Sequence, residues 1–354
     1  MTVIEEILDL ARWAPSGDNT QPWRFEVLNE SHVIVHGFDT RSHCVYDLDG
    51  RPSQISLGAL LETISIAASV HGREMVVQRR TGLPDTMPTF DVRLVALPGV
   101  MPDALVDCIM RRTVQRRAMR TRPLTPSEKS ELEHCVGPRF RIQWLEGFRH
   151  KWKAATLMFR NAKVRLTMPE AYEVHREIIE WGVQFSADKV PDAALGADPM
   201  TTSLMRFVMK SWGRVSFFNR YLAGTLAPRL QMDFLPGLAC AAHFVLVDRQ
   251  EPASIDDHVT AGRAVQRLWL TLTKLGLSQQ PEMTPLIFQA YVRKGVAFTR
   301  SRKVSNLARE VAARLRDVIG VDPAHAVWMG RVGGGPTAQA RSLRLPLPRL
   351  EWNK

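Results

Sequence analysis

The sequence of 354 residues has few cysteines, no long apolar run and none of the common nucleophile, metal or P-loop motifs, and each absence excludes a class of protein. Its four cysteines are scattered without Cys-x-x-Cys spacing, which argues against a disulfide scaffold or a zinc site and suits a reducing cytoplasm. Acidic residues at Glu5, Glu6 and Asp9 interrupt the N-terminus, and no uncharged stretch could cross a bilayer. We therefore expect a cytoplasmic protein without a signal peptide, an integral membrane segment or a bound metal.

Positive charge is in excess, because 47 Lys and Arg residues face 36 Asp and Glu residues and give a net charge of +11. Much of this charge lies between Arg111 and Arg122. A basic balance favours anionic partners such as a phosphorylated cofactor, nucleic acid or a membrane surface. The alternative for such a run is a solvated basic face, which is the commoner case.

One short stretch organises the chain, Ala14-Pro15-Ser16-Gly17-Asp18-Asn19-Thr20-Gln21-Pro22-Trp23. Apolar residues at helical spacing predict a helix over residues 3–13, and alternation after Pro22 predicts a strand. Pro15 ends the helix because its ring disfavours helical geometry at the preceding residue. The Gly-Asp-Asn run that follows tolerates unusual backbone angles. Such a loop can present N–H groups to a flat ligand, and the alternative is a plain helix-ending turn.

Alternating and amphipathic patterns along the rest of the chain predict an α+β protein. Strands are expected at residues 24–28, 32–38, 75–79, 91–96, 139–145, 238–247 and 325–329, and helices at residues 56–71, 258–275 and 303–319. Residues 103–136 are also predicted to be helical, with a break at Arg122-Pro123-Leu124 and a capped helix start at Thr125-Pro126-Ser127-Glu128. The segment from about 150 to 236 is predicted to be helical and is rich in Met, Trp and Phe. It is either a packed helical insertion or a lid over a site. The glycines of 330–335 are predicted to form a turn.

Two of the predicted helices share a glycine pattern. Gly58 and Gly262 occupy the same place in each, and Gly72 and Gly276 end them, so both pairs have the same separation (262 − 58 and 276 − 72 both equal 204). The alternative is the periodicity that any two buried helices share. Because a missing side chain lets two backbones approach closely, we expect these helices to cross at their glycines and the chain to consist of two related halves.

Four stretches together resemble the motifs of the nitroreductase superfamily, whose members hold FMN at a dimer interface. The Ala14–Trp23 loop resembles the signature A-P-S-x-x-N-x-Q-P-W. Arg111-Arg112-Thr113-Val114-Gln115 resembles the phosphate motif R-R-S-x-R, with Gln115 in place of the usual cation, and its continuation to Met119 resembles the Acg-like branch, in which two subunits are fused. The run from Arg341 to Pro346 resembles the terminal K-x-R-L-P clamp, and 275–284 resembles the G-L-x-x-x-P loop whose N–H approaches flavin N5.

The resemblance implies a nitroreductase-like fold in which two halves, residues 1–100 and 101–354, form a pseudo-dimer with a helical insertion at about 150–236. It implies one FMN per chain, because the first half keeps the signature loop whereas the second keeps the phosphate motif, the N5 loop and the clamp. The cofactor-binding residues that it assigns are Pro15, Ser16, Gly17, Asn19, Gln21, Arg111, Arg112, Thr113, Gln115, Met283, Thr284, Arg341 and Arg344.

The activity that the resemblance implies is ping-pong two-electron transfer. NAD(P)H would deliver hydride to flavin N5 and leave, and a small organic acceptor would then take the electrons. This chemistry needs a stacking slot more than an acid–base side chain, so no catalytic residue is assigned. The alternatives are an FMN-sequestering protein with a sealed site, a specialised biosynthetic flavin dehydrogenase, and a basic protein of nucleic acid or membrane surfaces. We expect no nucleic-acid partner, and a fused pseudo-dimer has no need of a second chain.

Overall fold

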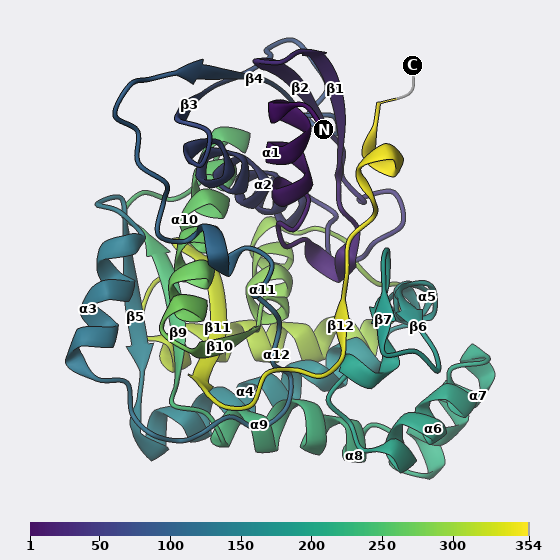
Figure 1. Ribbon diagram of the computed structural model, residues 1–354. Helices are drawn as coiled ribbons and strands as arrows, with labels where there is room; N and C mark the ends of the chain where they lie inside the picture. The colour runs from purple at the N-terminus through teal and green to yellow at the C-terminus, as the bar shows by residue number, and fades with distance from the viewer. Residues whose placement is uncertain (353–354) are drawn as a thin grey trace.

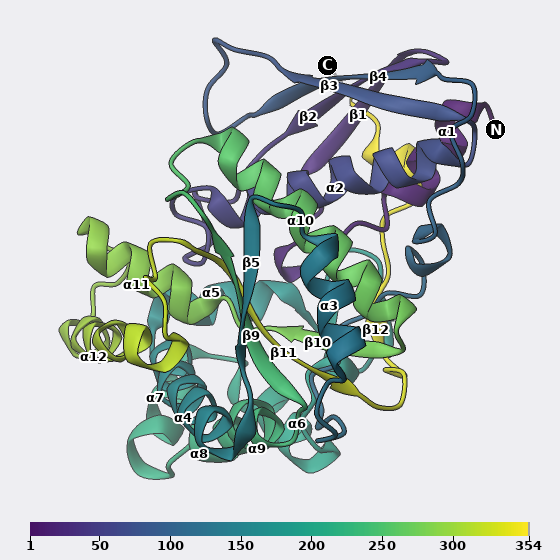
Figure 2. The same ribbon diagram turned by 90° about the vertical axis from the view of Figure 1, so that its left-hand side faces the viewer.

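The computed structural model describes residues 1–352, which build two four-stranded antiparallel sheets, each backed by a long helix (Figures 1 and 2). The first sheet and its helices are α1 (Val3–Ala11), β1 (Trp23–Asn29), β2 (His32–Gly37), α2 (Arg51–Ser69), β3 (Arg73–Arg79) and β4 (Thr89–Ala96). The second sheet and its helices are α3 (Pro126–Cys135), β5 (Phe140–Leu145), β9 (Ala242–Asp248), α10 (Ile255–Lys274), β10 (Leu277–Pro281) and β11 (Ala326–Gly334). Both units therefore run helix, strand, strand, helix, strand, strand.

The two sheets also share one strand order. The first is ordered β1-β2-β4-β3, and the second, from its other edge, β5-β9-β11-β10. Taking each unit's strands in chain order, both sheets read first, second, fourth, third. The α+β expectation with two related halves is confirmed by this shared plan, which two unrelated units would match only by coincidence.

The long helices α2 and α10 cross between the two sheets, and each helix makes the same contact with the other. A Cβ on Gly58 would lie 2.0 Å from the carbonyl oxygen of Val259, and a Cβ on Gly262 would lie 2.0 Å from that of Ile55. Close by, Nδ1 of His258 lies 2.8 Å from Oε1 of Gln54, a pair also separated by 204 residues. Equivalent residues therefore contact each other, as at a two-fold axis between subunits. The predicted crossing at the glycines is confirmed.

Two regions extend this shared plan. Between β5 and β9 lie α4 (Gly147–Leu166), α5 (Pro169–Ile178), β6 (Ile179–Glu180), β7 (Phe185–Ser186), β8 (Val190–Pro191), α6 (Pro199–Val208), α7 (Trp212–Tyr221), α8 (Leu226–Pro228), a π-helix (Arg229–Phe234) and α9 (Leu235–Leu238). Between β10 and β11 lie α11 (Thr284–Lys294) and α12 (Arg302–Ile319). Apolar residues of α4, α11 and α12 form a core on the face of the second sheet opposite α10.

Two local predictions were wrong for one shared reason. Residues 103–121 are not helical apart from one short 3-10 turn (Val106–Cys108), because much of this segment runs extended beside the second sheet, with the N–H of Met119 donating to Ala239 at 2.7 Å and that of Arg120 to Gly334 at 2.7 Å. The capped helix start predicted at Thr125 is confirmed, since Thr125 is the N-cap of α3. The glycines of 330–335 are no turn, because β11 continues through them to Gly334. A Cβ on Gly333 would lie 2.8 Å from that of Met119. The glycines thus make room for the segment that was mistaken for a helix.

The C-terminal tail returns from the second unit to the first (Figure 1). Its short strand β12 (Arg341–Ser342) pairs with β7, and further along Leu350 is buried in the core of the first unit. The N–H of Trp352 donates to Phe25 at 2.9 Å. The tail therefore carries Arg341 and Arg344 into the space between the two halves.

Candidate functional site

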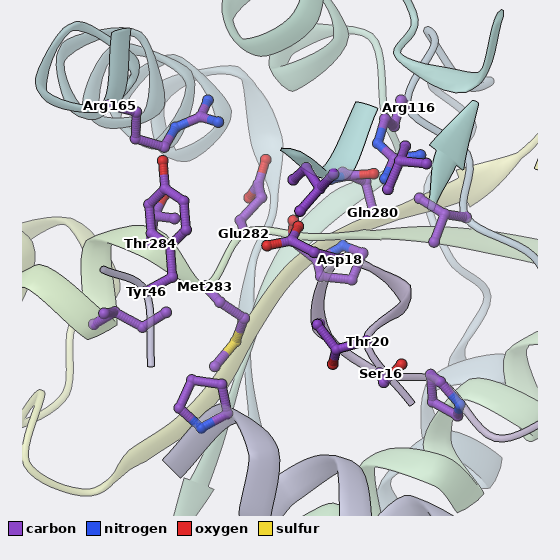
Figure 3. Close-up of a pocket in the computed structure, with 18 of the residues that line it drawn as sticks. Ser16, Asp18, Thr20, Tyr46, Arg116, Arg165, Gln280, Glu282, Met283 and Thr284 are labelled. Carbon is purple, nitrogen blue, oxygen red and sulfur yellow. The ribbon is translucent and has the colours of Figure 1, made fainter. Parts of the chain in front are cut away.

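A cavity of about 370 Å³ lies where the two units and the helical insertion meet (Figure 3). The signature loop and residues 40–59 line it from the first unit, the end of β10 and the start of α11 from the second, and α4 to the π-helix from the insertion. A smaller cavity of about 70 Å³ shares several wall residues with it, including Ser16, Asp18, Arg116 and Trp269. The two cavities therefore adjoin, the larger mainly apolar and the smaller bordered by arginines.

The signature loop holds an unusual backbone. Asp18, Asn19 and Gln21 have φ values of 50°, 64° and 48°, in the left-handed region that side chains other than glycine rarely adopt. Gly17 could adopt a positive φ most easily, but its φ is not positive, so the left-handed conformations fall on residues with side chains. Residues kept in this region each cost on the order of 1–3 kcal/mol and gather at ligand-binding sites.

Contacts with distant parts of the chain hold this loop in place. The amide nitrogen of Asn19 donates to the carbonyl oxygens of Ala187 and Lys189, both at 3.2 Å. Gln21 donates to Ala187 at 3.0 Å and accepts from the N–H of Leu345 at 2.8 Å. The insertion and the C-terminal tail therefore fix the loop between them, and the buried Gln21 serves this purpose rather than facing either cavity.

Three arginines border the smaller cavity. Arg112 and Arg344 are 3% and 8% exposed, and Arg341 is half-buried. Arg112 lies over the ring of Trp269 at 4.5 Å and Arg341 over that of Trp13 at 5.2 Å. Such stacking covers each guanidinium while leaving its edge free to donate.

No carboxylate within residues 1–352 forms a salt bridge with any of these arginines. Their partners are carbonyl or amide oxygens, as where Nε of Arg344 donates to Ala14 at 2.9 Å. Nε of Arg112 and Nε of Arg341 are buried with no hydrogen-bond partner among the described residues. Burial and the neighbouring cations lower the pKa of Arg112 and of Arg344, the latter to about 9. Uncompensated positive charge with unused donors suits a bound dianion such as a phosphate.

The structure brings most of the residues assigned from sequence to these two cavities. Pro15 and Ser16 line both, Gly17, Met283 and Thr284 line the larger, and Asn19, Thr113, Arg112, Arg341 and Arg344 line the smaller. Gln21, Arg111 and Gln115 line neither. Arg111 is exposed, and the amide of Gln115 donates to Pro336 at 2.9 Å and holds the segment that follows.

Several polar residues of the larger cavity carried no signal in the sequence. Asp18 faces the cavity from the signature loop (Figure 3), and burial raises the pKa of its carboxyl despite the attraction of Arg116 and Arg165. The hydroxyl of Tyr46 lies 3.0 Å from Nε2 of His175, whose pKa burial lowers to about 3. These residues come from separate elements and from no shared motif, so spacing alone could not have grouped them.

A buried charge cluster lies beneath the start of α11. Glu282 lies 2.7 Å from Nδ1 of His243 and accepts from Nη1 of Arg331 at 3.0 Å. Nε2 of His243 lies 2.8 Å from the carbonyl oxygen of Gly237, so both ring nitrogens face acceptors and both must carry protons. Burial alone would lower the pKa of His243, but the Glu282 carboxylate raises it to about 10. The cluster ties three strands and the insertion together under the cavity.

This cluster gives stability a dependence on pH. Because its folded-state pKa is above the unfolded value of 6.5, protonated His243 contributes fully below about pH 6.5, and its contribution is lost as pH rises toward about 10. We expect the stability difference between wild type and His243→Gln to be constant near pH 6 and to shrink by up to about 1.4 kcal/mol per pH unit above it. Urea unfolding of both proteins across this range measures the difference. A difference that grows with pH would contradict the assignment.

Comparisons with known proteins bear on this site, because residues 1–54, which include the signature loop, match the family model described as the nitroreductase family. This N-terminal segment is similar to the nitroreductase family. A putative NAD(P)H nitroreductase of Mycobacterium tuberculosis strain CDC 1551 / Oshkosh is 32% identical over 119 residues, which make up 32% of this chain and 33% of that protein. An uncharacterized protein of the same strain is 23% identical over 288 residues, 81% of this chain and 39% of its own length.

Solved nitroreductase structures align with this chain at low identity. A putative nitroreductase from Anabaena variabilis ATCC 29413 has a TM-score of 0.38 and 11% identity, covering 86% of this chain and 69% of that one. An FMN and NADPH-dependent nitroreductase from sphigopyxis sp. strain HMH has a TM-score of 0.35 and 16% identity, covering 71% of this chain and all of that one. The chain thus spans less than half the length of the curated relatives it matches. Among residues 1–352, no helix is long and apolar enough to cross a membrane.

Proposed function

We propose that this chain is an FMN-dependent oxidoreductase that binds one FMN between its two halves, with the phosphate at Arg112, Arg341 and Arg344. The observation that carries the proposal is the cluster of arginines with unused donors and no salt-bridge partner within residues 1–352, opening onto an apolar cavity. Asn19 and Thr113 add polar groups beside the arginines. When bound, FMN would supply two-electron hydride transfer from NAD(P)H to a small organic acceptor in ping-pong order.

The remaining assignments follow from this placement. Met283 and Thr284, at the start of α11, would present a backbone N–H to the flavin ring, and Pro15, Ser16 and Gly17 would face the ring from the other half. Residues 1–100 and 101–354 form the two halves, and about 150–236 cover the larger cavity. A chain that carries both halves of the site is complete as a monomer, and small molecules rather than nucleic acid are its partners.

Only one of the two related positions can hold a cofactor in this way. In the first unit, residues 12–22 between α1 and β1 form the signature loop, whereas in the second unit residues 136–139 join α3 directly to β5. The shorter connection has no room for an equivalent loop. We therefore expect one FMN per chain, measured as flavin released on denaturation of the purified protein against its concentration. Two FMN per chain would contradict the proposal of a single site.

Turnover separates an enzyme from a protein that only stores the cofactor. We expect the FMN-loaded chain to oxidise NAD(P)H steadily when given a nitroaromatic compound or a quinone. Bound FMN with negligible turnover would instead identify a sequestering protein whose insertion seals the cavity. A colourless preparation that takes up no added FMN would overturn the proposed function altogether.

A further inference from the structure

Helices α6 and α7 lie at the lower right of the molecule, away from the first sheet (Figure 1). Together with the segment that follows them, they carry an exposed apolar surface. Its members are Met200, Leu204, Phe207, Phe217, Tyr221, Leu222 and Leu226, of which Met200 is 80% exposed and Tyr221 62%. Phe207 and Tyr221 are linked through ring contacts with Phe217 and Phe218. Large exposed apolar patches on folded proteins mark surfaces that bind a partner.

The charges on this surface have a single sign. Residues 199–228 include Arg206, Lys210, Arg214 and Arg220 and no Asp or Glu. Arg214 lies over the ring of Phe207 at 4.3 Å, and Arg220 over that of Tyr221 at 5.4 Å. Cations set among exposed aromatic rings complement an anionic phospholipid surface, where rings enter the interface and basic groups meet the headgroups.

The opposite side of α6 belongs to the cavity. Met205 of α6 and Met209, which directly follows it, line the larger cavity, whereas Leu204 and Phe207 of α6 are exposed. Further apolar residues of the insertion, among them Met158 and Met232, complete that wall. One helix therefore separates the exposed apolar surface from the apolar end of the proposed site.

We propose that residues 199–228 bind an anionic phospholipid surface and that the cavity beneath α6 takes an apolar acceptor that partitions into that surface. The second part rests on the proposed function, whereas the first does not depend on a bound flavin. The basic and aromatic groups attach the chain at the membrane face, and the methionines behind α6 offer an adaptable apolar wall to acceptors of varied shape.

Vesicle binding tests the first part. We expect the 354-residue chain to sediment with vesicles containing about one third phosphatidylglycerol and to be released by salt, with little binding to phosphatidylcholine alone. Lys210→Gln/Arg220→Gln should weaken partitioning about 25-fold, at about fivefold per charge. Phe217→Ser/Tyr221→Ser should also lose binding, whereas Val76→Ser/Val95→Ser, which changes exposed residues on the first sheet, should not.

Two outcomes would overturn the lipid assignment. Equal binding by the wild type and both surface variants would exclude this surface, and self-association without vesicles that Phe217→Ser/Tyr221→Ser abolishes would identify it as an interface between copies. The acceptor is tested by turnover with a long-chain quinone in vesicles and with a short water-soluble one. Phe217→Ser/Tyr221→Ser should lose turnover with the long-chain quinone in vesicles and keep turnover with the water-soluble quinone. Loss of both rates would contradict the acceptor proposal, and a chain without flavin would fail the proposed function while leaving the vesicle result intact.

Discussion

Arg112→Gln is expected to weaken FMN binding by about 10- to 150-fold, because it removes a buried charged donor from the phosphate site. The same change should leave the apoprotein at least as stable as the wild type. Arg112 is buried beside Arg344 and Arg341 with no carboxylate partner among the described residues, and its burial, together with repulsion from these two arginines, lowers its pKa. Flavin fluorescence titration gives the affinity, and urea unfolding of the apoprotein gives the stability.

The adjacent residue provides the matched control. Arg111 is exposed and lines neither cavity, so Arg111→Gln should change FMN affinity little while removing the same charge. Equal losses in the two variants would show that net charge alone attracts the cofactor. Strong destabilisation of the Arg112→Gln apoprotein would mean that the arginine cluster is structural, and the phosphate assignment would fail.

Gly58→Ala is expected to destabilise the chain by about 3 kcal/mol or more, at the upper end of the cost of overpacking. The new methyl group would lie 2.0 Å from the carbonyl oxygen of Val259, and neither backbone at this crossing can yield without separating α2 from α10. Gly262→Ala creates the equivalent clash on the other side of the pseudo-two-fold axis, with the carbonyl oxygen of Ile55, and should lower the free energy of unfolding by a similar amount. Chemical unfolding measures both.

Because the two glycines share one contact, their substitutions should not have additive effects on stability. Once α2 and α10 are forced apart by one alanine, the second meets less resistance, so the double variant should be less destabilised than the sum of the single variants. Gly213→Ala serves as the control, because Gly213 lies in α7 and the new methyl group would come no closer than 4.0 Å to the hydroxyl oxygen of Ser211, so the change should be neutral or slightly stabilising. Additive losses in the double variant would argue against a shared contact.

The sequence predicted those elements of the fold that are determined by residues close together in the chain. The signature loop, the glycine-marked helices and the insertion's helical character could be anticipated because each depends on short-range spacing. The helical prediction for residues 103–121 failed because this segment's hydrogen bonds go to Gln279, Ala239 and Gly334, partners that only the folded sheet supplies. The helix start at Thr125 could be predicted because its capping residues are adjacent in the sequence. Gly333 was misread for the same reason, since its role is to admit Met119.

The residues of the candidate site also divide into those that sequence motifs predict and those that only the folded structure brings together. The arginines could be proposed from motifs, but Trp269 and Trp13 beneath them could not, because nothing in a predicted helix distinguishes a tryptophan under an arginine from one in the core. The cluster of His243, Glu282 and Arg331 was invisible for a related reason. Its members come from three strands or their ends, and only sheet pairing brings them together.

A crystal structure of the chain soaked with FMN tests the central claim most directly. The account predicts one flavin per chain, with its phosphate among the guanidinium groups of Arg112, Arg341 and Arg344 and its ring between the signature loop and the start of α11. A phosphate bound elsewhere, or a second flavin at the related position near residues 136–139, would contradict it.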